Sequence, residues 1–404
     1  MTLLERRTAV VVFLAFAFAY FFSALLRSVT ATLSPTLTRE FALNARDLGL
    51  LAGGYFLGFA ATQLPLGTWL DRHGPRQVSL GFLLMAVVGC LAFSAATSFY
   101  GLLAARVLCG VGVSACLMAP LTGFRRWLTP TAQLRANSWM LMTGSLGMLA
   151  STLPVQWLMP VIGWRPLFWG LAAAVALAMA LIAWKVPRWH GAPAQPGSKP
   201  GSYAEVWRNP YLRRVMPIGF FGYGGLIAIQ SLWAGPWLVR VTGYAPLEAA
   251  AGLFFINFSM LCTFLAWGMV TPWLTRKGMT TDRLITLGLP SSFVVLALIV
   301  LAGPAAGAAS WALFCVSSTF LSLAQPAVGM AFPPALAGRA LSAYNLVIFG
   351  GIFVTQWGIG LLIDGFGAIG FGEVASFQAA MAVFLGCSML SYGYFVLAKD
   401  NSRQ

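Results

Sequence analysis

The chain has 404 residues, of which 59% are hydrophobic and only 9% are charged, and its formal net charge is +15. A soluble globular domain carries about 25% charged residues, so this composition excludes a soluble fold and requires lipid around most of the chain. The positive charges lie between apolar stretches and form no basic cluster, which argues against nucleic-acid binding and favours a role in membrane orientation.

Apolar stretches long enough to cross a bilayer recur along the whole sequence, since one span needs about 20 apolar residues. The first stretch follows Arg6 and Arg7 as in a signal peptide, but it is long enough to span and is interpreted as an uncleaved first helix. We therefore expect an all-α membrane protein. The sequence predicts twelve transmembrane helices near residues 8–32, 47–70, 77–97, 99–122, 135–160, 164–187, 214–239, 247–270, 282–303, 308–332, 340–364 and 374–397.

The distribution of Lys and Arg predicts the orientation. With both termini in the cytoplasm, all but six of the 25 basic residues fall on the cytoplasmic side, as the positive-inside rule requires. We therefore expect a multi-pass protein of the cell inner membrane with cytoplasmic termini. The six exceptions are Arg27, Arg39, Arg46, Arg106, Arg165 and Arg240.

A polar stretch rich in Gly, Pro and Ser divides the chain near its middle. Its composition predicts a cytoplasmic linker over residues 188–213, between an N-terminal six-helix bundle (1–187) and a C-terminal one (214–404). The halves also resemble each other, because GTWLDRHG at 67–74 aligns with TPWLTRKG at 271–278, an offset of 204 residues. An internal repeat around a linker is typical of secondary transporters and predicts two bundles related by pseudo-two-fold symmetry.

Two motifs identify a family. The segment from Gly67 to Arg76 reads GTWLDRHGPR, placed in the predicted loop between the second and third spans, and Arg106 begins the pattern RVLCGVG in the fourth span. They resemble the G-x-x-x-D-R-x-G-x-R and R-x-x-x-G-x-G signatures of the major facilitator superfamily, and the resemblance covers essentially the whole chain. Gly163-Trp164-Arg165 is a third segment that resembles the family pattern.

The resemblance implies a transporter that works by alternating access between two six-helix bundles, usually as a monomer. It also implies that the acid of the first motif helps to clamp the cytoplasmic side. Two departures stand out: Thr275 replaces the acid in the second-half copy, and the fifth span lacks the family antiporter motif, which disfavours drug/proton antiport. The gating and coupling candidates are Gly67, Asp71, Arg72, Gly74, Arg76, Arg106 and Asp47.

Arg27 is the candidate for substrate binding with the clearest physical argument. It lies inside the first span, where a charge is costly and usually faces a cavity or a partner. A guanidinium binds carboxylate or phosphate through two parallel hydrogen bonds, and a first-helix arginine resembles the organic-anion branches of the family. The alternatives are that Arg27 extends toward the interface or pairs with Asp47. For Arg106, the resemblance implies a role in coupling or in contacts with helix carbonyls, and a purely structural role is equally open.

Neutral polar and aromatic residues inside the spans complete the candidate site, although interhelical hydrogen bonding is the more common role of buried amides. Spans 1, 4, 7 and 10 line the cavity in the family. No acid lies in the middle of a predicted span, so a central site should be net positive and should favour an anion. The remaining substrate-binding candidates are Tyr20, Tyr55, Tyr223, Gln230, Trp233, Gln325 and Asn345.

The function that these observations favour is secondary active transport of a small carboxylate-like anion, with proton symport as the expected coupling. Efflux of drugs or of a metabolite is the alternative, and a transport-inactive scaffold is the third possibility. The sequence has no ATP-binding loop, no nucleophile–histidine–acid set and no metal-ligand spacing among its six cysteines, so no enzyme activity, cofactor or metal is expected.

Overall fold

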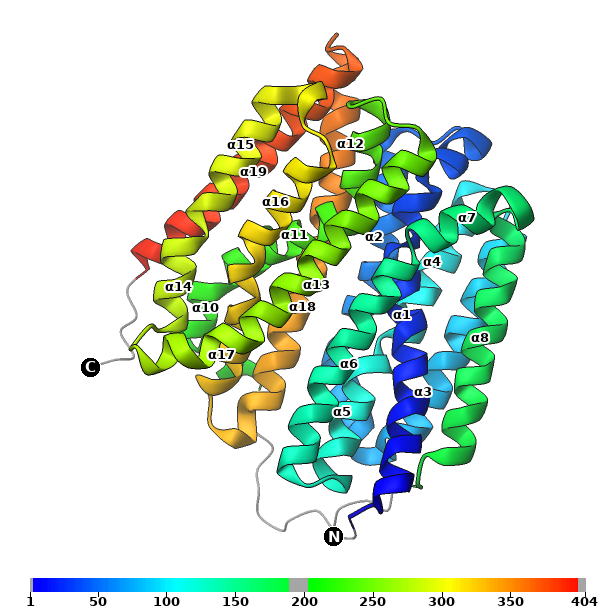
Figure 1. The fold of residues 1–404 in the computed structure, drawn as a ribbon, viewed down its shortest axis with the longest axis vertical. Helices are drawn as coiled ribbons and strands as arrows, with labels where there is room; N and C mark the ends of the chain where they lie inside the picture. Colours follow the sequence, from blue (N-terminus) through cyan, green and yellow to red (C-terminus); the bar gives the residue numbers. More distant parts are fainter. Residues whose placement is uncertain (1–2, 189–202, 399–404) are drawn as a thin grey trace. The chain divides into compact units, whose positions relative to one another are not determined.

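The structure is a computed structural model that describes residues 3–188 and 203–398, and within these ranges it consists of helices without β-strands (Figure 1). In the described residues, ten helices are long and apolar enough to cross a membrane, and an eleventh span results if the bent pair Thr131–Ala150 and Leu153–Ile162 counts as one. The 17-residue helix α2 (Ala45–Ala61) supplies one more. The expected twelve-helix, all-α layout therefore fits the fold.

The helices of the first half correspond to the predicted spans, and several run past them into polar sequence. They are α1 (Arg6–Phe41), α2 (Ala45–Ala61), α3 (Gln63–Ala95), α4 (Phe99–Val113), α5 (Ala115–Trp127), α6 (Pro130–Ala150), α7 (Leu153–Ile162) and α8 (Trp164–Lys185). The predicted fourth span is divided at Ser114 into α4 and α5, and the predicted fifth span is bent by 42° between α6 and α7.

In the second half, the seventh span contains two short π-helical segments. The elements are α9 (Tyr203–Arg208), α10 (Pro210–Pro217), η1 (Ile218–Tyr223), α11 (Gly224–Ala228), η2 (Ile229–Trp233), α12 (Ala234–Arg240), α13 (Pro246–Arg276), α14 (Thr281–Gly288), α15 (Pro290–Ala302), η3 (Gly303–Ala305), α16 (Ala308–Ser318), η4 (Thr319–Leu323), α17 (Ala324–Met330), α18 (Pro334–Ala368) and α19 (Glu373–Leu397).

Contacts between helices divide the chain into two compact units. Unit 1 comprises the described residues of 1–29 and 54–200, and unit 2 comprises those of 30–53 and 201–404. Helices α1 and α2 therefore each pass from one unit into the other. Of the predicted linker, residues 189–202 lie outside the described ranges, and α9 and α10 occupy residues that follow.

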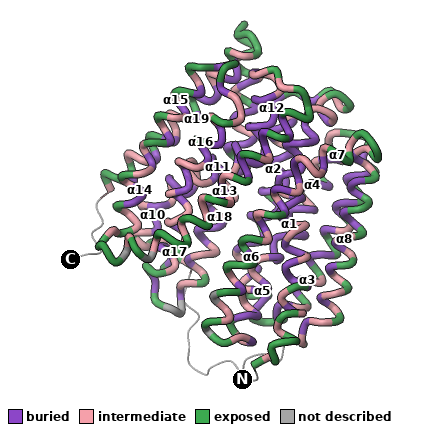
Figure 2. The backbone as a smooth tube through the Cα atoms, in the orientation of Figure 1, coloured by how far each residue is buried: buried purple, intermediate pink, exposed green. Residues whose placement is uncertain are grey.

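Each unit contains buried apolar residues and also exposes large apolar residues; Figure 2 colours the chain by burial. In unit 2, Trp237 packs edge-on against Trp311 with ring centroids 5.3 Å apart, and its indole N–H donates to the carbonyl of Ala306 at 3.0 Å. On α8, by contrast, Trp169 and Trp184 are 63% and 75% exposed. Such exposed apolar surface is unfavourable in water and suits a lipid environment.

The signature segment 67–76 does not form the loop that the sequence predicted. It lies within α3, and only Gly74 departs from helical geometry, with φ 78° and ψ 166°. The reason is local: a glycine in the left-handed region ends one helix, and Pro75, with its fixed φ and missing N–H, begins the next without an intervening loop. The second and third spans are therefore joined by a one-residue kink.

A glycine with the same positive φ recurs in the second half. Gly278 also has φ 78°, and it follows Gly74 by the 204 residues that separate the two repeats in the sequence. Both glycines are the last residue of the aligned segments, so the repeat preserves a backbone geometry as well as a sequence pattern.

We expect Gly74→Ala and Gly278→Ala each to destabilise the protein by about 1–2 kcal/mol, because a Cβ strains a left-handed residue. The change in the midpoint of thermal unfolding in detergent measures this. The control is Gly81→Ala on α3, where a Cβ would meet no atom within 4 Å and the helix should be unaffected or slightly stabilised. Equal stability of all three variants would contradict the expectation.

Candidate functional site

A cluster of polar side chains in unit 1 surrounds Arg27. Its guanidinium lies beside the phenol groups of Tyr20 on α1 and Tyr55 on α2 and interacts with them electrostatically. Tyr20 and Tyr55 are 6% and 0% exposed, whereas Arg27 itself is partly exposed. Within the described residues the buried Nε of Arg27 has no hydrogen-bond partner, and no carboxylate lies within ion-pair distance of the guanidinium. The cluster therefore presents a guanidinium and hydroxyl groups with no acid beside them.

The spacing on α1 explains why these groups converge. Tyr20, Ser23 and Arg27 are separated by three and four residues, so they lie along one face of the helix. The hydroxyl of Tyr55 donates to the carbonyl of Ser23 at 3.1 Å, which fixes α2 against this face. Ser23 was not among the predicted residues, although its position between Tyr20 and Arg27 in the helical period could have indicated it.

Arg106 on α4 supports the turn of α1 that carries Arg27. Its Nη1 donates to the carbonyl of Leu26 at 2.7 Å and its Nη2 to that of Arg27 at 3.3 Å. The side chain is fully buried, and its guanidinium lies 5.0 Å from the ring centroid of Tyr55, within the range of cation–π attraction. The structure thus shows the helix-carbonyl contacts that the sequence left as one of two alternatives.

The glycines of the RVLCGVG pattern allow close packing on two sides of α4. A Cβ on Gly110 would overlap the carbonyl of Tyr55 on α2, and a Cβ on Gly112 would overlap the backbone of Ala86 on α3. Small residues at such positions allow membrane helices to approach through their backbones. The pattern therefore sets the position of Tyr55, and with it one wall of the Arg27 cluster.

We expect Gly110→Ala and Gly112→Ala each to cost about 1–3 kcal/mol, since an added methyl group must displace a neighbouring backbone. Thermal unfolding of the purified variants measures the loss. Gly170→Ala on α8 is the matched control, because a Cβ there would meet nothing within 4 Å. Unfolding of the α4 variants at the temperature of the control would show that the packing is looser than the structure indicates.

Helix α6 closes another side of the cluster. A Cβ on Gly144 would lie 2.6 Å from the ring of Tyr20, and one on Gly147 would overlap the carbonyl of Phe21. The Gly144-Ser-Leu-Gly147 segment that stands in place of the family antiporter motif thus packs directly on the turn that carries Tyr20.

The candidates in the second half lie in unit 2, and most of them form hydrogen bonds to residues of another span. Gln230 donates to Asn257 at 2.9 Å, and Gln325 donates to Asn345 at 2.7 Å. Trp233 is fully buried, and its indole N–H donates to the carbonyl of Gln356 at 3.0 Å. Each of these bonds joins two different spans, which is the usual role of buried amides in membrane proteins. Tyr223, on η1, is partly buried.

The gating candidates are distributed over both units. In unit 1, Asp71 and Arg72 are exposed, Gly67 is partly exposed, and Arg76 donates to the carbonyl of Ala183 in the last turn of α8. A cation at a helix C-terminus is favourable because the free carbonyls carry partial negative charge. Asp47 lies in unit 2, in the first turn of α2, where its carboxylate is 3.4 Å from Nε of Arg46.

The electrostatics of unit 1 favour a negatively charged ligand. Its described residues include only two acids, Glu5 before α1 and Asp71 near Gly74, and both lie outside the Arg27 cluster. Arg27 and Arg106 are thus two positive groups within the spans, where a charge needs a partner. Both terminal nitrogens of Arg106 already donate to helix carbonyls, so Arg27 is the group that could bind a carboxylate through its planar fork.

Comparison with known proteins agrees with this architecture. Residues 16–356 match the model of the Major Facilitator Superfamily. The chain is 24% identical over 298 residues to the probable L-galactonate transporter of Escherichia coli (strain K12), covering 68% of this chain and 64% of that protein. It is 24% identical over 277 residues to the 4-hydroxybenzoate transporter PcaK of Acinetobacter baylyi, covering 59% and 60%.

The aligned region thus spans less than two thirds of the length of these curated relatives. Among solved structures, the inward-facing, unoccupied bacterial homologue of the human lysosomal transporter Spinster superposes with a TM-score of 0.77 at 18% identity, over 98% of this chain and 97% of that one. The relatives are transporters and not enzymes. The chain therefore belongs to the Major Facilitator Superfamily and is a multi-pass membrane protein.

Proposed function

We propose that the protein is a secondary active transporter of a small organic anion of the carboxylate type, and that Arg27 binds the anionic group. The observation that carries this proposal is the Arg27 guanidinium, which lies inside a span beside the phenol groups of Tyr20 and Tyr55, with no carboxylate within ion-pair distance among the described residues. A carboxylate that enters this cluster gains charge-assisted hydrogen bonds and neutralises a costly intramembrane charge.

The relatives support an anionic substrate over a cationic one. Galactonate and 4-hydroxybenzoate, which name two of the matched transporters, are both carboxylates. A cation would need a negative group near its binding site, and in the described part of unit 1 both acids lie away from Arg27. The aromatic rings of Tyr20 and Tyr55 add apolar surface, which suits an organic carboxylate better than a fully hydrated inorganic ion.

The transport cycle that we propose is alternating access in a monomer, with both termini in the cytoplasm of a cell whose inner membrane holds the protein. Protons are the proposed coupling ion, and Tyr223, Gln325 and Asn345 are the proposed contributions of the second half to the substrate site. Asp71, Arg72 and Arg76 are proposed to clamp the cytoplasmic side, as the family signature implies.

Ligand-induced thermal stabilisation of the purified protein tests the substrate class. The panel contains galactonate, 4-hydroxybenzoate, the corresponding neutral amides and a set of lipophilic cations. A ligand that binds only the folded protein stabilises it by about 2.7 kcal/mol at 100 times its dissociation constant. We expect stabilisation by carboxylates and none by the amides. Stabilisation by lipophilic cations alone would overturn the proposal and make efflux the leading function.

A further inference from the structure

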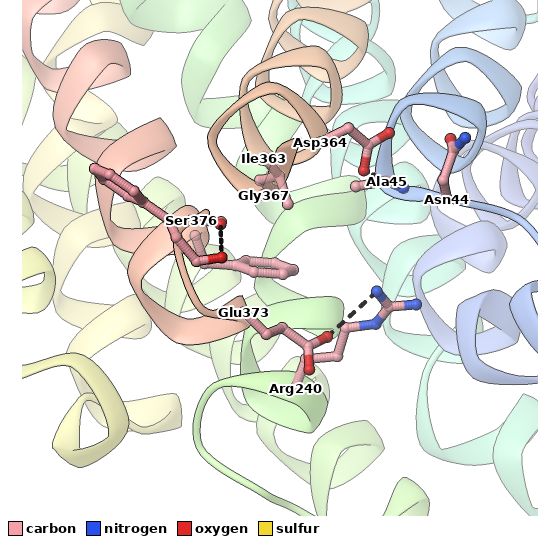
Figure 3. A pocket seen from close by; sticks show the side chains of 10 residues that line it. Asn44, Ala45, Arg240, Ile363, Asp364, Gly367, Glu373 and Ser376 are labelled. Carbon is pink, nitrogen blue, oxygen red and sulfur yellow. Dashed lines mark hydrogen bonds and ion pairs between the residues drawn. The ribbon is translucent and has the colours of Figure 1, made fainter. Parts of the chain in front are cut away.

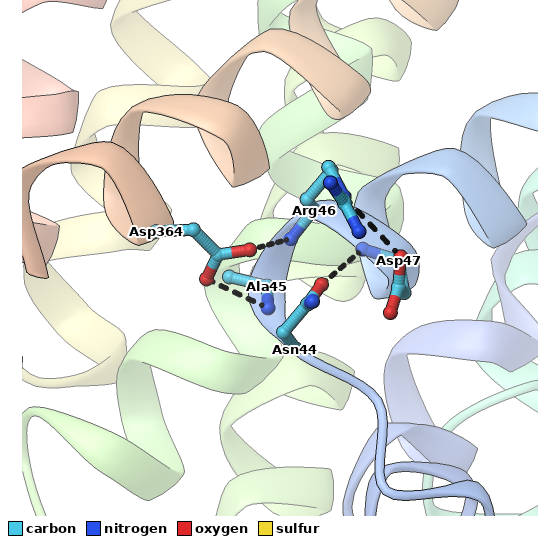
Figure 4. Close-up of polar contacts among 5 residues, drawn as sticks. All are labelled: Asn44, Ala45, Arg46, Asp47 and Asp364. Carbon is cyan, nitrogen blue, oxygen red and sulfur yellow. Dashed lines mark hydrogen bonds and ion pairs between the residues drawn. The ribbon is translucent and has the colours of Figure 1, made fainter. Parts of the chain in front are cut away.

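The carboxylate of Asp364, near the end of α18, caps the first turn of α2 (Figure 4). Its Oδ1 accepts from the backbone N–H of Ala45 at 3.1 Å and its Oδ2 from that of Arg46 at 2.8 Å. These N–H groups have no partner within their own helix, and the N-terminal end of a helix attracts negative charge. Two charge-assisted hydrogen bonds therefore join Asp364 to Ala45 and Arg46, across 319 and 318 positions of sequence.

Small residues extend this contact along both helices. A Cβ on Gly360 would overlap the carbonyl of Ala45, a Cβ on Gly49 would overlap that of Gln356, and a Cβ on Gly53 would lie 3.0 Å from the ring of Phe353. On α2 the contact positions 45, 49 and 53 recur every four residues, so they form one face of the helix. The first half of α2 is thus packed backbone to backbone against α18.

The same carboxylate lies on the wall of a cavity of about 380 Å³ within unit 2 (Figure 3). The cavity also contains Arg240 and Glu373, whose Nη1 and Oε1 are 3.5 Å apart. Glu373 is thus a second acid on this cavity, but its carboxylate pairs with the side chain of Arg240, whereas that of Asp364 accepts from the backbone of α2. It provides a matched control for any effect that comes only from removing negative charge here.

We infer that Asp364 is the residue that clamps the N-terminal end of α2 to α18, and that this clamp must open once in every transport cycle. The inference rests on the proposed function, because alternating access requires the first six spans to move against the last six. Residues 30–53 belong to the first six spans by sequence but pack within unit 2. Exposure of the substrate path on the α2 N-terminal side therefore requires that residues 45–53 leave α18, which breaks both bonds to Asp364.

Hydrogen–deuterium exchange of the full-length protein in detergent, without ligand, tests the clamp. In Asp364→Ala we expect exchange to rise about tenfold in peptides covering 45–53 and, with them, 353–364, since loss of a cap shifts the helix contact toward the open state. Gly360→Ala should give the same pattern, because the added methyl group pushes α18 away from α2 without changing any charge. Faster exchange along α18 distinguishes the clamp from a simple cap, which affects only the first turn of α2.

Two control variants make the result specific. Glu373→Gln removes the other acid of the cavity, and Gly358→Ala adds a methyl group to α18 where nothing lies within 4 Å. Both should exchange as the wild type does. The inference is overturned if Asp364→Ala leaves exchange unchanged, or if the increase is confined to residues 45 and 46. The readout needs no substrate, so a failed carboxylate screen would refute the proposed substrate and leave this result to stand on its own.

Discussion

Arg27→Ala is expected to abolish ligand-induced stabilisation by carboxylates while leaving the fold intact. Removing one partner of a buried, hydrogen-bonded charge pair costs about 2–5 kcal/mol, which corresponds to a rise of about 30-fold to several thousandfold in the dissociation constant. Because the guanidinium has no carboxylate partner within the described chain, its removal should not destabilise the protein without ligand. Isothermal titration or thermal shift in detergent measures both quantities.

Two variants control for charge and for general effects on α1. Arg27→Lys keeps the charge but loses the planar fork, so binding should weaken by about tenfold and not disappear. Arg39→Ala removes an exposed arginine from the same helix and should bind as the wild type does. Normal carboxylate binding by Arg27→Ala would show that the anion is held elsewhere.

Arg106→Ala is expected to have the largest effect on stability. The substitution removes the second donors of the Leu26 and Arg27 carbonyls, which keep their helical bonds, removes the contact with the Tyr55 ring and empties the space of a large, fully buried side chain. Hydrogen bonds from a charged group contribute about 1.5–3 kcal/mol and the cavity adds to this loss, so the total should reach about 3–5 kcal/mol. The midpoint of thermal unfolding without ligand gives the direct comparison.

Arg165→Ala is the natural comparison for this variant. Arg165 also donates to a helix-end carbonyl, that of Ala96 at 3.2 Å, and stacks on Trp164, but its side chain is partly exposed. We expect a loss of about 1 kcal/mol or less at this position. If the two variants were equally stable, Arg106 would not be the structural support of the turn that carries Arg27.

Much of the fold follows from the spacing of apolar residues. The predicted spans coincide with helices because a bilayer-spanning segment has little freedom to adopt any other structure. What hydropathy missed lies where helices continue into polar sequence, as α1 does to Phe41, or where they join without a loop, as at Gly74 and Pro75. The Gly-Pro pair that ends one helix and begins the next is visible in the sequence, but averaging hydropathy over a long stretch of residues does not detect it.

The site was less accessible to sequence reasoning because its contacts join residues far apart in the chain. Arg27 attracted attention as a charge inside a span, which is a local property. The contacts of Arg106 with α1 and of Asp364 with α2 depend on which helices pack together. The contacting residues are 80 positions apart in the first case and 318 in the second, so the local sequence does not indicate either contact. The pairing of Gln230 with Asn257 likewise requires two amides on different helices to face each other.

The clamp at Asp364 complements the role that the family signature assigns to Asp71. The second span begins at the N–H groups that Asp364 binds and ends near Asp71, so an acid is associated with each of its ends. If the signature clamp closes one side of the transporter, the Asp364 clamp provides the corresponding restraint at the other end of the same span. Alternating access would then exchange one carboxylate restraint for the other.

The central claim is carboxylate transport that depends on Arg27, and its most direct test is uptake into proteoliposomes. The substrate is the radiolabelled carboxylate with the largest thermal shift, and its neutral amide serves as competitor. We predict saturable uptake that other carboxylates inhibit, that the amide does not inhibit, and that Arg27→Ala abolishes while Arg39→Ala preserves it. Uptake that is equal in wild type and Arg27→Ala, or inhibited equally by the amide, would contradict the claim.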